Sequence, residues 1–243
     1  MKSSKRIRLS ALLAVIVAGH LPASVLLNVP GTSNIFSAGQ AGQTAQEVDF
    51  IPAVGNVLTF TGPGIPTGSA VTGTVYCSPM YPGAGPDGAN LGSQAPATNI
   101  SSSTTNISPI QFTGNEMFLV AVFLGAGLPS SPVPSIGDYG AGGALSSHNG
   151  VYTPLIGQVF FVGDGLTGTG SGSIQQFVVP TGATRLFLGF ADALNFAGEA
   201  GMYSDNFGSL DVNLQILAPE PGTLTLFVLG LAGFVIGRKR FVA

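Results

Sequence analysis

Residues Ser209–Ile216 read Ser-Leu-Asp-Val-Asn-Leu-Gln-Ile, the cleanest alternation of polar and apolar side chains in the chain. Side chains alternate between the two faces of an extended backbone. Leu210, Val212, Leu214 and Ile216 would therefore lie on one face, and the polar residues between them on the other. The stretch predicts a strand with one face in a core and one face in solvent.

Comparable short stretches recur along the central part of the chain, and helical periodicity is missing there. Several short strands between Gly- and Pro-rich turns, without helices, are typical of a β-sandwich or jelly roll. We therefore predict an all-β domain over residues 47–217. The expected strands are Val54–Thr61, Gly68–Cys77, Met117–Leu124, Leu155–Val162, Ile174–Val179, Arg185–Ala191 and Ser209–Ile216.

Two tracts between these strands, Gly83–Pro109 and Gly125–Gly150, are rich in Gly, Ser and other small or turn-forming residues. Loops of that length are uncommon in a compact domain unless they are functional or poorly ordered. We expect each tract to be one or the other.

Charged residues make up only 8% of the chain, and their placement is uneven. Arg185 is the only basic residue between Leu9 and Gly237, whereas all 11 acidic residues lie in that stretch. A nucleic-acid-binding protein needs a basic surface, so this class is excluded. The single cysteine, Cys77, permits no intramolecular disulfide, and we expect it to be a small buried side chain rather than a nucleophile.

The N-terminal end has the order of a secretory signal peptide: basic residues up to Arg8, an apolar run over Ala11–Gly19, then small residues. The apolar run would span only about 14 Å as a helix, too short for a membrane anchor. We predict a signal peptide at residues 1–24, followed by a flexible mature N-terminus at residues 25–46.

The C-terminal end combines three features in order. Pro219-Glu220-Pro221 comes first, an apolar stretch follows at residues 223–237, and the basic cluster Arg238-Lys239-Arg240 comes last. As a helix the apolar stretch would be about 22 Å long, short for a membrane span. Basic residues after such a span stop its transfer and stay on the cytoplasmic side. We predict a sorting signal with a short transmembrane helix over residues 218–243.

This C-terminal arrangement resembles the PEP-CTERM protein-sorting domain of exported proteins in Gram-negative bacteria. The resemblance implies that an exosortase recognises the chain and acts at or near Pro219-Glu220-Pro221. It further implies a precursor anchored transiently in the inner membrane, whose product reaches the cell surface or the extracellular biofilm matrix. In this reading the chain is the substrate of an enzyme and is not an enzyme itself.

The densest group of candidate metal ligands lies after the strand expected at Arg185–Ala191. Asp192 and Asp205 would supply carboxylates and Asn206 a neutral oxygen, while nearby glycines leave backbone carbonyls accessible. Ca²⁺ binds six to eight oxygens of these kinds, often from one irregular loop. Asp and Asn also favour ordinary turns, so a solvated hairpin loop is the alternative.

The segment Gln176–Leu214 is similar to the C-terminal half of bacterial calcium-dependent galactose-binding lectins of the PA-I type. The similarity lies in the turn Pro180–Thr184, in Asp192 at a strand end, and in the loop Met202–Leu210. The resemblance implies side-chain Ca²⁺ ligands at Asp192, Asp205 and Asn206 and a backbone ligand at Met202. The bound ion would then coordinate sugar hydroxyls. The loop between Asp192 and Met202 is longer than in the lectin pattern, and Asp205 replaces an Asn.

Three functions are compatible with these features. The first is a non-enzymatic surface or matrix protein whose lectin-like sandwich binds Ca²⁺ and extracellular polysaccharide. The second is a purely structural matrix protein without a sugar site. The third is a secreted glycan-active enzyme, which would need two carboxylates that meet in the fold, such as Asp87 and Asp205.

Overall fold

The structure, a computed structural model, describes residues 23–49, 56–63, 70–92, 97–102, 104–139, 147 and 149–217. Within these residues the fold is all-β, as the sequence predicts, and its only helices are three short 3-10 turns. None of the helices in the described part is long and apolar enough to cross a membrane. Residues 1–22 of the predicted signal peptide and the C-terminal segment 218–243 lie outside the described residues.

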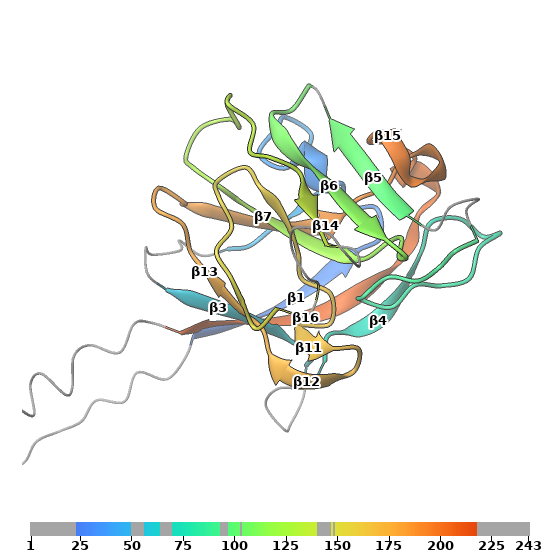
Figure 1. The fold of residues 1–243 in the computed structure, drawn as a ribbon, viewed down its shortest axis with the longest axis horizontal. Helices are drawn as coiled ribbons and strands as arrows, with labels where there is room; N and C mark the ends of the chain where they lie inside the picture. Colours follow the sequence, from blue (N-terminus) through green and yellow to red (C-terminus); the bar gives the residue numbers. More distant parts are fainter. Residues whose placement is uncertain are drawn as a thin grey trace, which may run out of the picture.

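The largest sheet has six strands and is built around β16, the strand that contains Ser209–Ile216. One edge of β16 pairs with β1 over Ser209–Ile216, and the other edge pairs first with β4 and then with β3. Figure 1 shows β4 and β3 following one another along β16. The strands are β1 (Ala23–Pro30), β16 (Phe207–Leu217), β4 (Thr72–Tyr76), β3 (Val57–Thr61), β13 (Gln176–Val178) and β9 (Val151–Tyr152).

Three smaller sheets complete the fold. The second sheet has the order β10-β7-β14-β2, and a third has the order β15-β5-β6-β8. Strands β11 and β12 form a hairpin. Their bounds are β10 (Val159–Phe161), β7 (Leu119–Leu124), β14 (Arg185–Phe190), β2 (Gln46–Glu47), β15 (Ala197–Glu199), β5 (Ala97–Ser102), β6 (Ile107–Thr113), β8 (Gly137–Asp138), β11 (Leu166–Gly168) and β12 (Ser171–Ile174).

The six-stranded sheet and the β10-β7-β14-β2 sheet share one hydrophobic core. Phe160 of β10 and Phe177 of β13 meet between them, with ring centroids 5.3 Å apart. Phe60 of β3 contacts Phe177 edge to face at 5.1 Å. Every side chain of β7 is buried, which explains its unbroken apolar sequence. The sheets thus pack face to face as a sandwich requires, and the jelly-roll topology within that class stays a prediction.

The expected strands coincide with observed ones wherever the structure describes them, although most observed strands are shorter. The polar and apolar residues of β16 alternate as predicted, with Leu210, Val212 and Leu214 fully buried. The range expected at Leu155–Val162 contains only the three residues of β10, because Leu155 and Ile156 belong to an exposed turn. The inward-facing apolar residues were therefore identified correctly, and the strand ends less so.

The prediction of a flexible N-terminus at residues 25–46 is wrong. Residues 23–30 form β1, and Ile35–Ser37 form the 3-10 turn η1, with Ile35 and Phe36 buried. Leu27 and Val29 of β1 are buried as well, whereas Leu26 is 67% exposed. The stretch was misread because it is uncharged and because its partner β16 lies about 180 residues away in the chain.

The tract Gly83–Pro109 also contains regular structure that the sequence did not indicate. It includes β5 and the start of β6, and these two strands pair with each other. The inward-facing residues of β5 are Thr98, Ile100 and Ser102, so two of the three are polar. A strand that buries hydroxyl side chains has no apolar alternation, which is why composition alone suggested a loop. The tract Gly125–Gly150 holds β8, while residues 140–146 and His148 lie outside the described residues.

Candidate functional site

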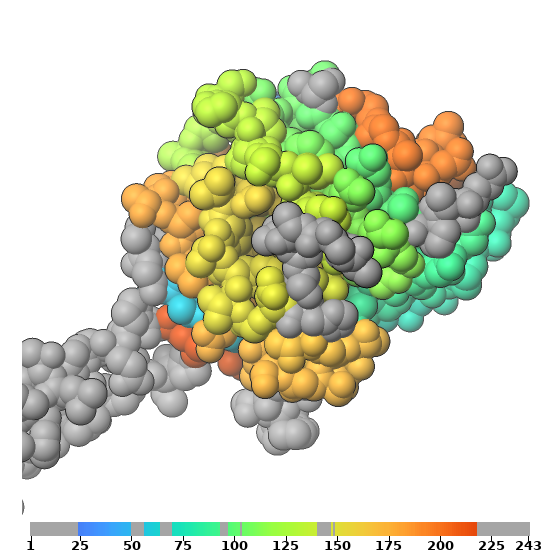
Figure 2. Space-filling model, in the orientation of Figure 1, coloured from blue at the N-terminus to red at the C-terminus, as the bar shows by residue number. Residues whose placement is uncertain are grey.

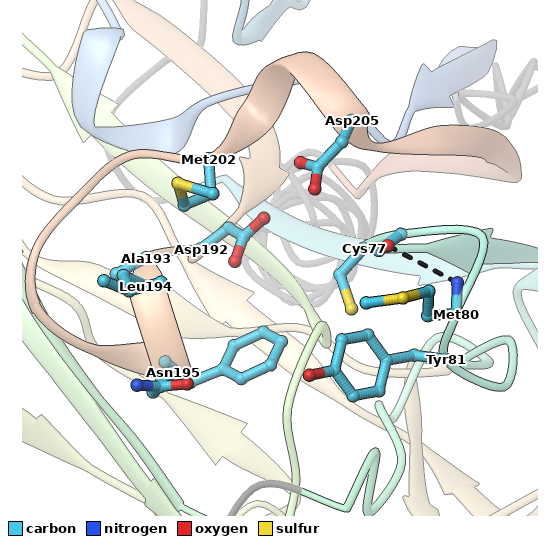
Figure 3. A pocket seen from close by; sticks show the side chains of 11 residues that line it. Cys77, Met80, Tyr81, Asp192, Ala193, Leu194, Asn195, Met202 and Asp205 are labelled. Carbon is cyan, nitrogen blue, oxygen red and sulfur yellow. Dashed lines mark hydrogen bonds between the residues drawn. The ribbon is translucent and has the colours of Figure 1, made fainter.

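A pocket of about 220 Å³ lies at one end of the sandwich, where three chain segments meet. One segment is the turn after β4, another follows β14 and includes the 3-10 turn η2 (Leu194–Phe196), and the third contains η3 (Tyr203–Asp205) just before β16. Figure 3 shows the carboxylates of Asp192 and Asp205 on one side of this pocket and Cys77, Met80 and Tyr81 on another. The lining residues are Cys77, Ser78, Met80, Tyr81, Asp192, Ala193, Leu194, Asn195, Phe196, Met202 and Asp205.

Strand pairing between β4 and β16 brings the first and third segments together. Tyr76, the last residue of β4, pairs with Phe207, the first residue of β16. Their rings stack with centroids 4.5 Å apart and an interplanar angle of 4°. The turn that begins at Cys77 therefore lies beside the turn that ends at Asn206, although well over 100 residues separate them in the sequence.

Hydrogen bonds from Tyr203 fix the loop between β14 and β16. The phenol oxygen accepts the backbone N–H of Asp192 at 2.9 Å and donates to the carbonyl oxygen of Phe190 at 2.9 Å. The backbone N–H of Gly201 donates to the carbonyl oxygen of Asp192, also at 2.9 Å. Asp192 is thus held by its backbone from both sides, which leaves its side chain to face the pocket.

The carboxyl group of Asp192 is the most unusual polar group of the site. The residue is only 2% exposed, and its Oδ2 atom has no hydrogen-bond partner among the described residues. The pKa of Asp192 is raised to about 6: burial is the largest cause, hydrogen bonds from the side chain of Asn206 and the backbone N–H of Ala193 oppose it, and the negative charge of Asp205 adds to it. A buried acceptor without a donor is costly unless a ligand or water satisfies it.

The structure places three of the four predicted Ca²⁺ ligands in the wall of one pocket and the fourth, Asn206, next to them in the chain. Asp192, Met202 and Asp205 line the pocket. Asn206 is not among the lining residues; it is 5% exposed, interacts with Asp192 through its side chain, and its Nδ2 donates to the carbonyl oxygen of Gly31 at 3.1 Å. The Oδ1 atom of Asn206 is buried and has no hydrogen-bond partner in the described part of the chain. Two buried oxygens, one on Asp192 and one on Asn206, therefore lack donors.

This set of groups fits a hard cation better than an anion. No Lys, Arg or His lines the pocket, so no side chain offsets the charges of Asp192 and Asp205. Among the residues that the structure describes, no three His, Cys, Asp or Glu side chains form a metal-binding group. A Ca²⁺ ion would accordingly need neutral oxygens in addition, from Asn206, from the backbone at Met202 and from water, as is common for this ion.

The sequence did not identify the wall formed by Cys77, Ser78, Met80 and Tyr81. Cys77 is 7% exposed, in accordance with the expectation of a buried side chain. Burial and the nearby charge of Asp192 raise the pKa of its thiol to about 11, so the thiol stays protonated at neutral pH. A turn after a strand was the only signal in the sequence, because nothing local indicates that β4 lies next to β16.

Three further acidic residues serve the fold and not the pocket. Asp87 accepts the backbone N–H of Asp164 at 2.8 Å, and Asp164 accepts that of Leu166 at 2.8 Å. Glu116 accepts the backbone N–H of Leu91 at 2.8 Å from a fully buried position. Asp87 does not line the pocket with Asp205, so the carboxylate pair considered from the sequence is not formed there. The carboxylate that accompanies Asp205 in the pocket is that of Asp192.

The fold and the pocket define an all-β domain with an acidic, partly apolar site at one end. Comparison with known protein families then identifies the PEP-CTERM protein-sorting motif at residues 217–240. The match begins at Leu217, the last residue of β16, and confirms the sorting signal expected from Pro219-Glu220-Pro221 and Arg238-Lys239-Arg240. No curated protein matches the chain. The lectin resemblance of the central domain gains no support from these comparisons.

The sorting motif indicates how the chain is processed and exported. It implies processing by an exosortase and a membrane-anchored precursor that is exported to the cell surface or matrix. The all-β domain is accordingly the part that this machinery delivers.

Proposed function

We propose that this chain is a non-enzymatic surface or matrix protein of a Gram-negative bacterium whose end pocket binds Ca²⁺ and, through the ion, extracellular polysaccharide. The observation that carries the proposal is the buried carboxyl group of Asp192, whose Oδ2 atom has no hydrogen-bond partner among the described residues and which lines the pocket with a second carboxylate, that of Asp205. A cation would relieve both the missing bond and the repulsion between these acids.

Calcium supplies what this pocket lacks. Its preferred ligands are oxygens of carboxylates, amides and backbone carbonyls, and the residues Asp192, Asp205, Asn206 and Met202 offer all three kinds. Ca²⁺ binding would also reverse the electrostatic effect of burial, because a nearby positive charge lowers the pKa of Asp192. The carboxylate, which with a pKa of about 6 is already mostly ionised at neutral pH, would then no longer destabilise the fold through its buried charge.

Carbohydrate is the ligand class that best suits the rest of the pocket. Ca²⁺ that is bound at the bottom of an open pocket can accept two vicinal hydroxyl groups in place of water. Tyr81 and Phe196 add aromatic surface, and Met80 and Met202 add exposed apolar surface at 84% and 48% exposure. Pockets that combine apolar walls with a few polar groups orient small ligands in this way.

Calorimetric titration with Ca²⁺ tests the metal site directly. At a Ca²⁺ concentration of 100 times the Kd, the fold should gain about 2.7 kcal/mol in unfolding free energy, and a chelator should remove that gain. The variant Asp192→Ala should lose both the binding heat and the stabilisation. Asp211→Asn is the matched control, because Asp211 is an exposed acid in the middle of β16. The proposal fails if the wild-type protein binds no Ca²⁺ at millimolar concentration.

A glycan array with and without Ca²⁺ separates this function from that of a purely structural matrix protein. Sugar binding that disappears with chelator supports the ion-mediated mode. Ca²⁺ binding without any glycan signal would refute the polysaccharide part of the proposal. It would indicate a structural domain that Ca²⁺ stabilises.

Processing is tested by replacing Pro219-Glu220-Pro221 with three alanines in cells that contain an exosortase. The variant should accumulate as a membrane-bound, uncleaved form, whereas the wild-type chain should be found without its last residues. Mass spectrometry of the surface fraction distinguishes the two. Wild-type protein that extends intact to Ala243 at the cell surface would contradict exosortase cleavage.

One observation favours a second function, glycan hydrolysis. Glycosidases use two carboxylates, and their acid must be protonated near neutral pH. Asp192 and Asp205 line one pocket, and the pKa of Asp192 is raised to about 6. Release of reducing sugar from a polysaccharide, abolished by Asp192→Asn and by Asp205→Asn, would establish this activity. A protein that binds glycans without cleaving them would support the first function.

A further inference from the structure

The chain enters the domain at the start of β1 and leaves it at the end of β16, and these two points lie side by side. Ala23, the first residue of β1, pairs with Ile216, and the antiparallel register continues without interruption to Pro30 opposite Ser209. Residues that precede β1 and residues that follow β16 therefore attach to neighbouring strands at one end of the six-stranded sheet. We call this end, with Ala23, Leu217 and the adjacent Val57, the tether end.

The pocket lies at the opposite end of the same two strands. Met202 and Asp205 come just before Phe207, where β16 begins, and Gly31, just after β1, accepts the hydrogen bond from Asn206. Ten residue steps at about 3.3 Å each place Phe207 about 33 Å from Leu217. Figure 1 shows β15, which follows the pocket residue Phe196, at the opposite end of the molecule from β3 and β13.

Charged side chains lie at both ends of this axis. The turn Pro180–Thr184 lies at the tether end, because it follows β13, whose Val178 pairs with Val57. Arg185, the only basic residue in the described part of the chain, comes next and begins β14. Asp192 follows the other end of this strand, in the pocket with Asp205. Glu47 and Asp49 lie beside Arg185, because Phe187 pairs with Glu47 and the backbone N–H of Val48 donates to the carbonyl oxygen of Leu186, so charge does not distinguish the tether end from the pocket end.

The distance between the domain and the membrane segment is short. The sorting motif begins at Leu217 itself, and only residues 218–222 separate β16 from the apolar stretch 223–237. Five residues span at most about 18 Å even when fully extended. The tether end also carries exposed apolar side chains, since Leu155 is 57% and Ile156 36% exposed. The Cδ1 atom of Ile156 lies 3.2 Å from the position that a Cβ atom on Gly182 would occupy, which places this turn beside Pro180–Thr184.

We propose that the tether end of the sandwich rests on the lipid bilayer in the anchored precursor, with the pocket directed away from the membrane. This orientation rests on the proposed anchoring by residues 223–237. It makes the pocket accessible to extracellular ligands before exosortase acts. It also means that cleavage near Pro219-Glu220-Pro221 removes no strand, because β16 ends at Leu217. Figure 2 shows the segments that flank the pocket, orange near residue 200 and blue-green near residue 85, protruding together at one end of the surface.

The orientation can be measured by lipid quenching of site-specific fluorophores. The full chain, with alanines at 219–221 to prevent cleavage and Cys77→Ala to remove the native thiol, is reconstituted into phosphatidylcholine vesicles that contain a nitroxide-headgroup lipid. Single cysteines are placed at three exposed positions: Thr181 at the tether end, Thr72 opposite the middle of β16, and Ser204 beside the pocket. Circular dichroism verifies that each labelled protein keeps its β structure.

We expect quenching to decrease steadily in the order Thr181, Thr72, Ser204, with Ser204 close to its value in vesicles without nitroxide. Equal quenching at Thr181 and Ser204 in protein that floats with the vesicles would overturn the orientation while leaving the anchoring intact. Protein that does not float with the vesicles would instead refute the anchoring, and the orientation with it.

Discussion

The phenol oxygen of Tyr203 lies 2.9 Å from the backbone nitrogen of Asp192, whose N–H it accepts. The same hydroxyl donates to the carbonyl oxygen of Phe190 at 2.9 Å, so one side chain satisfies both a donor and an acceptor at the end of β14. Burial raises the pKa of Tyr203 well above its ordinary value, which keeps this hydroxyl protonated as a donor. The position of the Asp192 carboxyl therefore depends on a residue that does not line the pocket.

Replacing Tyr203 with phenylalanine should destabilise the domain and weaken Ca²⁺ binding together. The change leaves the Asp192 N–H and the Phe190 carbonyl without their partner, at a cost of about 1–3 kcal/mol. Chemical denaturation measures the loss, and calorimetry measures the affinity. Tyr81→Phe is the control, because that residue is 40% exposed and its hydroxyl forms no hydrogen bond with the residues that the structure describes. Unchanged stability in Tyr203→Phe would show that the hydroxyl does not hold the loop.

The stability of the calcium-free protein should depend on the ionisation of Asp192. The fold raises the pKa of this group from 3.8 to about 6, so folding favours the protonated form. The corresponding stabilisation is complete below about pH 4 and is lost as the pH rises through about 6. Asp192→Asn should thus match the wild type near pH 4 and exceed it by up to about 3 kcal/mol at pH 7.5.

Urea denaturation in the presence of a chelator, at a series of pH values, measures this difference. The quantity to follow is the unfolding free energy of Asp192→Asn minus that of the wild type. If it stays constant between pH 4 and 7.5, the carboxyl is not shifted by burial. Saturating Ca²⁺ should reverse its sign at pH 7.5, since only the wild type would gain from the ion.

Two glycines with similar backbone angles should respond very differently to alanine. Gly165 has a φ of +81°, and a Cβ atom there would lie 1.8 Å from the carbonyl oxygen of Phe60. Gly170 has a φ of +66° and open space at the same position. Gly170→Ala should cost only about 1–2 kcal/mol, the strain of a left-handed backbone. Gly165→Ala should cost clearly more, because the clash is with backbone. Equal unfolding free energies of the two variants in chemical denaturation would contradict the close approach of Gly165 to the backbone of Phe60 in β3.

Removal of β1 should damage the domain even though the sequence suggested a flexible segment there. A chain that begins at Gly31 loses the buried side chains of Leu27 and Val29 and exposes one whole edge of β16. Each buried aliphatic side chain contributes about 1.5–3 kcal/mol, so the truncated chain should be destabilised by several kcal/mol and prone to associate through that edge. A chain that begins at Ala23 should keep full stability in thermal denaturation. Indistinguishable melting curves for the two chains would show that β1 is dispensable.

The strands that could be predicted are those with a local signal. In β16, β7 and β14 the arrangement of apolar residues indicates which side chains are buried, whatever the partner strand is. In β5 no such signal exists, because it buries Thr98 and Ser102, and in β1 the alternation of Val25, Leu27 and Val29 is obscured by Leu26, which is apolar but exposed. These strands form because a neighbouring strand satisfies their backbone hydrogen bonds, and that neighbour is not visible in the local sequence.

The candidate site likewise has one part that the sequence could predict and one part that it could not. Asp192, Met202, Asp205 and Asn206 lie within 15 residues of one another, so their clustering could be expected from sequence spacing. Cys77, Met80 and Tyr81, which form another wall of the pocket, precede Asp192 by more than 100 residues in the sequence. They lie beside it because β4 pairs with β16, with Tyr76 opposite Phe207. Strand pairing of this range depends on the packing of the whole domain.

The sequence by itself determined the all-β class and the sorting signal, because both depend on residues close together in the chain: the alternation in Ser209–Ile216 and the order of motif, apolar stretch and basic cluster at the C-terminus. Only the tertiary structure decided that β1 pairs with β16, that Cys77 faces the same pocket as Asp192, and that the two ends of the domain meet at the end of β16 that lies farther from that pocket. The physical reason is that side-chain alternation is a local property, whereas the choice of partner strand depends on which distant segments bury their apolar faces together.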